Sequence, residues 1–122
     1  MVFYHGTNSE LLGNINQEGL FQPYLTDSME LAEYYAEATD GDGDPVILQV
    51  IVRNPGLLEP DRPSLAEPVG YGSILSEKIE EQLKKMRSRD LERWEKTLPI
   101  TRTVRYNGII SPSDIRLIDI RQ

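Results

Sequence analysis

Short runs of β-branched and aromatic residues mark the segments that we expect to form strands. The most hydrophobic run, VILQVIVR at 46–53, is eight residues long and predicts a central strand rather than a helix. The VFYH run at 2–5 and the PYLT run at 23–26 predict two shorter strands. Near the end of the chain, TRTVRYNGII at 101–110 alternates like a strand, and IRLIDI at 115–120 predicts a closing strand.

Apolar residues at helical spacing predict helices between these strands. The first helix is expected between Ser9, as its N-cap, and Gly19, as its stop. Asp27 and Glu30 have the spacing of a capping box and predict the start of a second helix. A third helix is expected over 74–94.

Proline and glycine separate the central strand from the third helix. Residues 54–73 contain four of the eight prolines and three of the nine glycines, which predicts a long loop. Strands and helices follow one another without a steady βαβ rhythm, so we expect an α+β fold with a mixed, mostly antiparallel sheet flanked by helices. The length of 122 residues predicts a single domain over 1–122.

The composition narrows the classes of function. The chain has no cysteine and one histidine, which excludes disulfides and thiolate sites and leads us to expect no metal centre. The net charge of −7 argues against non-specific nucleic-acid binding, because phosphates are repelled. Basic residues nevertheless gather over 84–105, as either a solvated helix face or a surface for an anionic ligand or an acidic partner.

The sequence carries no pattern typical of a membrane or secreted protein. No apolar run reaches the length of about 18 residues that a membrane-spanning helix needs. The N-terminus lacks the basic region and apolar segment of a secretory leader. Together with the absence of cysteine, these features predict a cytoplasmic protein without a membrane partner.

His5, the only histidine of the chain, lies in the stretch FYHGTN at 3–8. Taken alone, a histidine beside aromatic residues is more often structural than catalytic. Here it stands at the end of a strand and is followed by Gly6, and a glycine at a strand end allows a polar ligand to approach the backbone. The imidazole can hydrogen-bond a ribose hydroxyl, and the backbone of Gly6 can pair with an amide.

Three tyrosines form the second candidate feature. In YLTDSMELAEYYAE at 24–37, Tyr35 falls on the helix face expected to meet the core, and Tyr34 falls at the edge of that face. Tyr24, at the preceding strand end, is then the expected partner of Tyr34 in bracketing a flat heterocycle. The alternative interpretation is that all three are ordinary core and rim aromatics.

The motif FYHGT at 3–7 and the motif YLTDSMELAEYYA at 24–36, separated by a helix that ends in EGL, resemble the ADP-ribosyltransferase superfamily. The resemblance is greatest to its histidine–tyrosine branch, which includes poly(ADP-ribose) polymerases and RNA 2′-phosphotransferases. It implies that His5 contacts the adenosine-side ribose of NAD and that Gly6 pairs through its backbone with the nicotinamide amide. Thr7 occupies the hydroxyl position of the same motif.

The resemblance also assigns the tyrosines and the arrangement of the sheet. It implies a sheet in two parts around an NAD cleft, with NAD as co-substrate. Tyr24 matches the strand tyrosine of the family, and Tyr34 matches the stacking tyrosine of an Ala-x-Tyr step. Because the spacing is one residue shorter than in the polymerases, Tyr35 stays open as the ligand contact.

The strand at 101–110 departs from the family, in which a glutamate on this strand often polarises the nicotinamide-ribose hydroxyl. This strand contains no acid. We expect the cleft instead to meet Arg105 as a phosphate clamp or Asn107 as a hydroxyl partner. Acids in the loop at 54–73 are the alternative source of a carboxylate: Glu59, Asp61 and Glu67.

These features together predict an NAD-dependent ADP-ribosyltransferase with His5, Tyr34, Arg105 and Asn107 as its catalytic residues. The net negative charge favours a protein acceptor, and the basic stretch at 84–105 leaves nucleic acid open. One alternative is an RNA 2′-phosphotransferase-like enzyme. The other is a catalytically inactive module that binds an ADP-ribose-type nucleotide or a partner protein.

Overall fold

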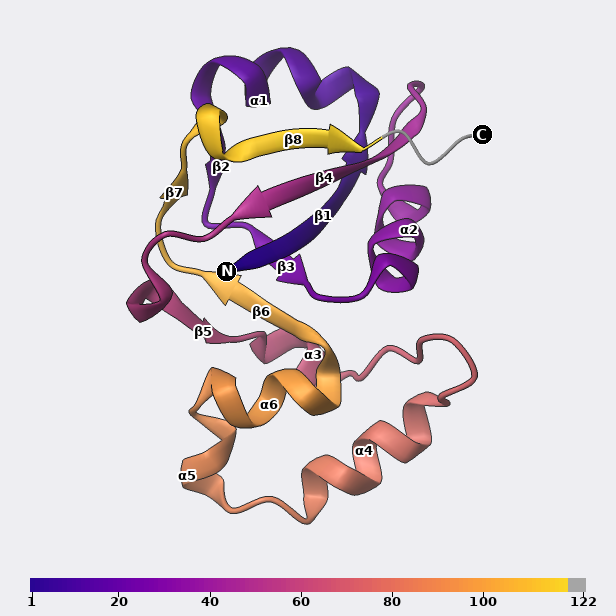
Figure 1. Ribbon diagram of the computed structural model, residues 1–122. Coiled ribbons are helices and arrows are strands. Elements are labelled where there is room, and N and C mark those ends of the chain that lie inside the picture. The colour runs from indigo at the N-terminus through magenta and orange to yellow at the C-terminus, as the bar shows by residue number, and fades with distance from the viewer. Residues whose placement is uncertain (119–122) are drawn as a thin grey trace.

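The computed structural model describes residues 1–118 (Figure 1). Its strands are β1 (Val2–Asn8), β2 (Leu20–Phe21), β3 (Tyr24–Thr26), β4 (Pro45–Ile51), β5 (Leu58–Pro60), β6 (Thr103–Tyr106), β7 (Ile109–Ile110) and β8 (Ile115–Ile118). Its helices are α1 (Leu12–Glu18), α2 (Met29–Ala38), α3 (Arg62–Ala66), α4 (Ser76–Lys84), α5 (Ser88–Leu91) and α6 (Trp94–Thr101). Single 3₁₀ turns lie at Ser9–Leu11, Pro55–Leu57 and Pro112–Asp114. The end of the expected closing strand, beyond residue 118, lies outside the described residues.

The strands confirm an α+β fold with a mostly antiparallel sheet. The main sheet has the order β5-β6-β3-β1-β4-β8, and β2 pairs separately with β7. Every pairing between the described strands is antiparallel. The run VILQVIVR forms the inner strand β4, which pairs with β1 along the full length of β1, from Val2↔Ile51 to Asn8↔Pro45.

One face of the main sheet carries the largest hydrophobic cluster. Phe3 of β1, Val50 of β4 and Val104 of β6 belong to it, each at most 1% exposed. Tyr106 is also buried in this cluster, two residues after Val104 and on the same side of β6. Trp94, at the start of α6, packs against the cluster. It connects the lower helices, α4 to α6 in Figure 1, with the sheet.

Helix α2 packs across β1 and β4, as Figure 1 shows beside the sheet. Its apolar positions Leu31, Ala32 and Ala36 are buried, as their helical spacing predicts. Two of the three are alanines, which allow the helix backbone to approach β1 closely. Because of this close approach, residues of α2 line the candidate site described below.

The helix expected over 74–94 is divided into α4, α5 and the start of α6, so that prediction was wrong in extent. Arg87 is extended, with φ −70° and ψ 146°, and Arg93 is extended, with φ −112° and ψ 116°. Each interrupts the helical hydrogen bonds and turns the chain. The turns bring α4 and α5 back against α6, which itself packs on β5 and β6.

The proline-rich segment 54–73 contains more regular structure than predicted. It holds β5 at the edge of the sheet and the short helix α3. Asp61 is the N-cap of α3, because its Oδ1 accepts a hydrogen bond from the Ser64 N–H at 3.1 Å. Proline in the first turn suits this helix start, since that turn needs no amide donor.

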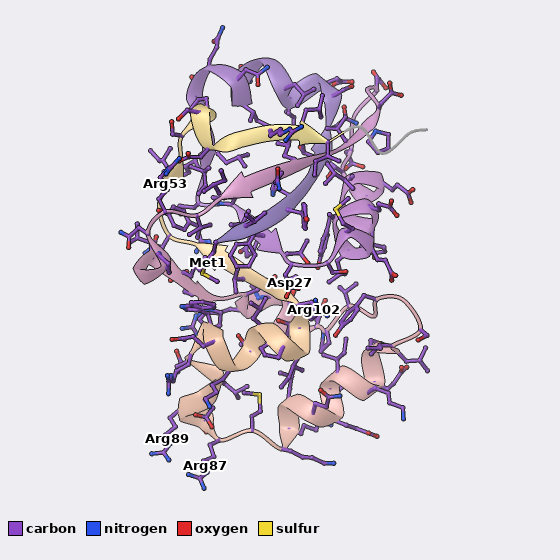
Figure 2. All side chains as sticks on the ribbon, viewed as in Figure 1. Met1, Asp27, Arg53, Arg87, Arg89 and Arg102 are labelled. Atoms are coloured by element: carbon purple, nitrogen blue, oxygen red, sulfur yellow. The ribbon has the colours of Figure 1, made fainter. Side chains whose placement is uncertain are left out.

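The caps of the helices differ from two predictions. Ser28 rather than Asp27 caps α2, with its Oγ accepting from the Leu31 N–H at 3.3 Å. Asp27 instead lies 2.7 Å from Arg102 Nε in an ion pair, and Figure 2 shows both side chains close together. Before α1, Asn8 caps the 3₁₀ turn in place of Ser9. Gly19 ends α1 with a φ of 80°, as predicted.

Arg87 and Arg89, from the basic stretch, point away from the body of the protein in Figure 2. Within residues 1–118, neither side chain forms an ion pair. Across the same range, no helix has both the length and the apolar character that crossing a membrane requires.

Candidate functional site

The candidate site is a pocket where β1 and β3 separate. Among the described residues, β3 is in register with β1 at Tyr4↔Thr26 alone, whereas β4 accompanies β1 along its full length. The edge of β1 beyond Tyr4 is therefore free to form a pocket wall. The cavity has a volume of about 340 Å³, within the range of about 300–1,000 Å³ typical of small-molecule sites. We call it the β1–β3 pocket, and it is lined by Tyr4, His5, Gly6, Tyr24, Leu25, Thr26, Tyr35, Ala38, Thr39, Asp61, Pro63, Ser64 and Thr103.

His5 bridges the two separating strands. Its Nδ1 lies 2.8 Å from the carbonyl oxygen of Tyr24. A carbonyl can only accept a hydrogen bond, so the proton of the neutral ring sits on Nδ1 and the lone pair of Nε2 is an acceptor. Burial lowers the pKa of His5, and the hydrogen bond to Tyr24 raises it in part. The imidazole is therefore neutral at pH 7 and presents an acceptor nitrogen.

Gly6 lines the pocket and also meets helix α2. A Cβ added to Gly6 would lie 2.1 Å from the carbonyl oxygen of Ala32 and 2.7 Å from the backbone nitrogen of Ala36. The packing of α2 is thus one reason for a glycine here, besides the ligand access inferred from the sequence. Thr7 is buried, lies opposite Val46 in the β1–β4 register, and is not among the residues lining the pocket.

The two neighbouring tyrosines of α2 do not lie as expected. Tyr35 lines the pocket and is half-buried, whereas Tyr34 is 52% exposed and is not among the lining residues. Their rings meet edge to face, with centroids 5.5 Å apart and planes at 76°. The pocket therefore meets Tyr35 rather than Tyr34, because the burial of Ala32 and Ala36 against the sheet sets the rotation of α2. Tyr24 lines the pocket as expected.

Tyr35 shares its end of the pocket with residues of α3. Burial raises the pKa of the Tyr35 phenol, a hydrogen bond with Ser64 opposes that change, and the nearby Asp61 carboxylate adds to it. Tyr35 consequently keeps its proton at neutral pH. The phenol, the hydroxyl of Ser64 and the carboxylate of Asp61 form one polar group at this end of the pocket.

Asp61 is the loop carboxylate that reaches the pocket. Its side chain is 4% exposed, and Ser64 donates to it twice, from its N–H to Oδ1 at 3.1 Å and from its Oγ to Oδ2 at 2.8 Å. Of the other loop acids, Glu67 is exposed and Glu59 pairs with Arg105. Of the three loop acids considered as an alternative source of a carboxylate, Asp61 alone therefore lines the pocket.

Arg105 does not line the pocket, contrary to expectation. Its guanidinium is held by the Gln22 Oε1, at 2.6 Å from Nη2, and by the Glu59 Oε1, at 3.4 Å from Nη1. It also lies over the Tyr24 ring, 5.7 Å from the ring centroid. Arg105 is paired with Tyr24 in the β3–β6 register, which directs its side chain to these partners.

Asn107 is exposed beyond the end of β6, and the pocket meets Thr103 of that strand instead. The Asn107 Oδ1 accepts a hydrogen bond from Gln22 Nε2 at 3.2 Å. Thr103 is 2% exposed, and its Oγ1 has no hydrogen-bond partner within the described residues. On this strand the pocket therefore meets Thr103 rather than Arg105 or Asn107.

Several residues of the pocket were missed by the sequence analysis, Ser64 and Thr103 among them. A signal for Ser64 was available in DRPS at 61–64, where Asp, then Pro, then Ser three residues after Asp have the spacing of a helix start. No local signal distinguished Thr103 from Thr101, because both share one side of an expected strand. In the structure Thr101 is the last residue of α6 and only Thr103 belongs to β6, so the strand expected over 101–110 is shorter than predicted.

No family model matches the chain, and comparisons with curated proteins and with solved structures also return no match. Within residues 1–118, there is no group of three or more His, Asp or Glu side chains able to hold a metal ion. Function is therefore inferred from the β1–β3 pocket and the motifs that line it.

Proposed function

We propose that the protein binds NAD in the β1–β3 pocket and transfers ADP-ribose to a macromolecular acceptor. The observation that carries this proposal is the meeting of His5, Gly6, Tyr24 and Tyr35 around one pocket. These residues come from the two motifs that resemble the histidine–tyrosine branch of the ADP-ribosyltransferases. We propose the corresponding fold type on the same grounds, with the opening between β1 and β3 as its cleft.

The chemistry of His5 suits a ribose. Because Nδ1–H is donated to Tyr24, the neutral ring offers Nε2 as an acceptor for a ribose hydroxyl. Backbone atoms of Gly6 are the proposed partners of the nicotinamide carboxamide. Tyr35 takes the stacking role that the sequence analysis assigned to Tyr34, because Tyr35 is the one of the two that faces the pocket.

In the proposed reaction, the bond between nicotinamide and C1′ of the ribose breaks, and nicotinamide leaves with the bonding electrons as a neutral molecule. A nucleophile of the acceptor bonds to C1′ and loses its proton. Positive charge develops on the ribose during this step, and a preorganised carboxylate stabilises such charge. We assign that role to Asp61, the loop acid on the pocket wall.

Among the lining residues there is no lysine or arginine, so the pocket offers little to a phosphate group. This gives less support to RNA 2′-phosphotransferase-like chemistry than to transfer of ADP-ribose. The diphosphate of NAD would extend out of the pocket.

The test is to incubate the full chain with NAD and a cell lysate, using label on the adenylate part, and to measure nicotinamide release and label on protein or nucleic acid. We expect release of nicotinamide and label on one of the two fractions. NAD binding without release or label would favour the inactive binding module. Absence of both binding and release would overturn the proposal.

The neighbouring tyrosines provide a matched pair of variants. Tyr35→Ala is expected to weaken NAD binding roughly tenfold or more, because stacking of a base on an aromatic ring contributes about 1–3 kcal/mol. Tyr34→Ala removes the same side chain one position away, outside the pocket, and should leave the affinity unchanged. Titration calorimetry measures both. Loss of affinity in Tyr34→Ala alone would return the stacking role to Tyr34.

A further inference from the structure

Asp61 is a buried acid without a cationic partner in the described part of the chain. The residue is 4% exposed, and both of its carboxylate oxygens accept hydrogen bonds from Ser64. No Lys, Arg or N-terminal amine within residues 1–118 forms an ion pair with it. Burying a charge without a counter-charge is costly, so this arrangement requires a compensating partner.

The arginine next to Asp61 in the chain and the arginine of the adjacent strand β6 are each paired with another acid. Arg62, the next residue, pairs with Glu92 at 2.7 Å on the surface. Arg105 on the neighbouring strand pairs with Glu59 at 3.4 Å. Since each of these cations has its own carboxylate, neither forms an ion pair with Asp61.

The other polar groups of the pocket also favour a ligand that donates hydrogen bonds. The neutral ring of His5 presents Nε2 as an acceptor. Thr103 Oγ1 is buried and has no hydrogen-bond partner within the described residues. Tyr35 adds an aromatic ring to the wall, which can attract a flat cation, whereas the Tyr24 ring already interacts with the Arg105 guanidinium. The hydroxyl of Thr103 can also donate, but a phosphate group offers no hydrogen to His5 Nε2 and carries the same sign of charge as a carboxylate.

We propose that Asp61 makes the β1–β3 pocket selective for a positively charged, flat heterocyclic nucleoside. In terms of the proposed function, on which this inference rests, the charged pyridinium ring of oxidised NAD lies in the pocket beside Asp61. The neutral ring of reduced NAD lacks the charge that Asp61 requires, and is rejected although its size is nearly the same.

The test compares oxidised nicotinamide riboside, which is cationic, with reduced nicotinamide riboside, which is neutral. Both lack phosphate, so their affinities report on the pocket alone. We expect the unaltered full chain to bind the oxidised form at least tenfold more tightly by titration calorimetry. In Asp61→Asn this ratio should fall toward one, while Glu67→Gln, which removes a charge from the same segment outside the pocket, should keep it.

Asparagine is as good an N-cap as aspartate, so Asp61→Asn is expected to keep α3 and the fold. If that variant does not fold, the ratio of the two riboside affinities in the unaltered protein still tests whether the pocket selects the cationic form. Equal binding of the two ribosides would overturn the inference, and the proposed function would stand if NAD still releases nicotinamide. If binding is selective and depends on Asp61 but no nicotinamide is released from NAD, the inference stands. The proposed transfer reaction is then overturned. Binding of neither riboside would overturn the inference.

Discussion

At the scale of single residues, one position can serve both the packing of the fold and the lining of the pocket. Gly6 lines the pocket and also removes the Cβ that would strike α2. His5 faces the pocket and also connects β1 to the carbonyl of Tyr24 across the opening of the sheet. Each residue therefore affects stability as well as ligand binding, and the two effects have to be measured separately.

The first prediction concerns Gly6→Ala. The new methyl group would lie 2.1 Å from the Ala32 carbonyl oxygen, so α2 must move away from β1. We expect the free energy of unfolding to fall by about 1–3 kcal/mol, as in other overpacked cores, measured by urea denaturation. Gly13→Ala is the matched control, since nothing lies within 4 Å of its added Cβ and alanine favours the helix. Equal stability of Gly6→Ala and the unaltered protein would contradict the packing described here.

The second prediction concerns the titration of His5. Burial lowers its pKa below the ordinary value of 6.5, despite the opposing hydrogen bond to Tyr24. NMR titration gives this pKa without ambiguity, because the chain has one histidine. A measured pKa at or above 6.5 would contradict the assignment of a neutral, buried ring.

The sign of the stability effect follows from this lowered pKa. Below pH 6.5 the unfolded chain binds the proton more readily than the folded protein does. The contribution of His5 is therefore fully present above pH 6.5 and is lost as the pH falls through the folded pKa. In His5→Gln this component of the pH dependence should be absent from urea denaturation curves.

At the scale of elements, the start of α2 shows how two adjacent polar residues divide their tasks. Ser28 caps the helix, and Asp27 pairs with Arg102. Arg102 stands at the end of α6 with a φ of 61°, a left-handed conformation that turns the chain from α6 into β6. The ion pair therefore connects the start of α2 with the turn that begins β6.

The third prediction separates these two tasks. Ser28→Ala should lower the free energy of unfolding by about 1 kcal/mol, because the Leu31 N–H loses its acceptor. Asp27→Asn should cost at most about 1 kcal/mol, since the pair with Arg102 is about one-third exposed and screened by water. Urea denaturation with the helical CD signal measures both. An unchanged free energy of unfolding in Ser28→Ala would contradict Ser28 as the cap of α2.

At the scale of the whole molecule, the sheet and the lower helices α4 to α6 differ in the burial that stabilises them against local unfolding. β1 and β4 pair along seven residue positions and carry buried side chains on both faces of the sheet. Helix α5 has no buried residue and packs against α6. The basic side chains Arg87 and Arg89 lie in this exposed region, away from the pocket.

Native-state hydrogen exchange tests this difference. Amides of β1 and β4 should exchange slowest, near the limit set by global unfolding, whereas amides of Ser88–Leu91 should exchange much faster by local opening. Exchange of α5 as slow as that of β4 would mean that the lower helices unfold together with the sheet. The proposed pocket belongs chiefly to the slow part of the molecule, because β1, β3 and α2 line it.

Local patterns predicted much of the fold correctly. The eight-residue run at 46–53 specifies an inner strand because β-branched residues fit a sheet buried on both faces. Gly19 specifies a helix end because it adopts a positive φ readily. These properties depend on a residue and its near neighbours in the chain. His5 and Gly6 were expected at the end of a strand over 2–5, but β1 continues to Asn8 and holds both residues in its interior, because it pairs with β4 along its whole length.

Other features were decided by tertiary structure alone. Asp27 resembles a cap in sequence but bonds to Arg102, 75 positions away, and nothing near Asp27 announces that partner. Tyr35 rather than Tyr34 faces the pocket because alanines and Gly6 bring α2 so close to β1. Asp61 reaches the pocket wall because α3 begins there. The sequence by itself determined the inner strands, the first two helices and the motifs, whereas the division of the later helices and the side-chain partners depended on strand register and helix approach, which long-range packing sets.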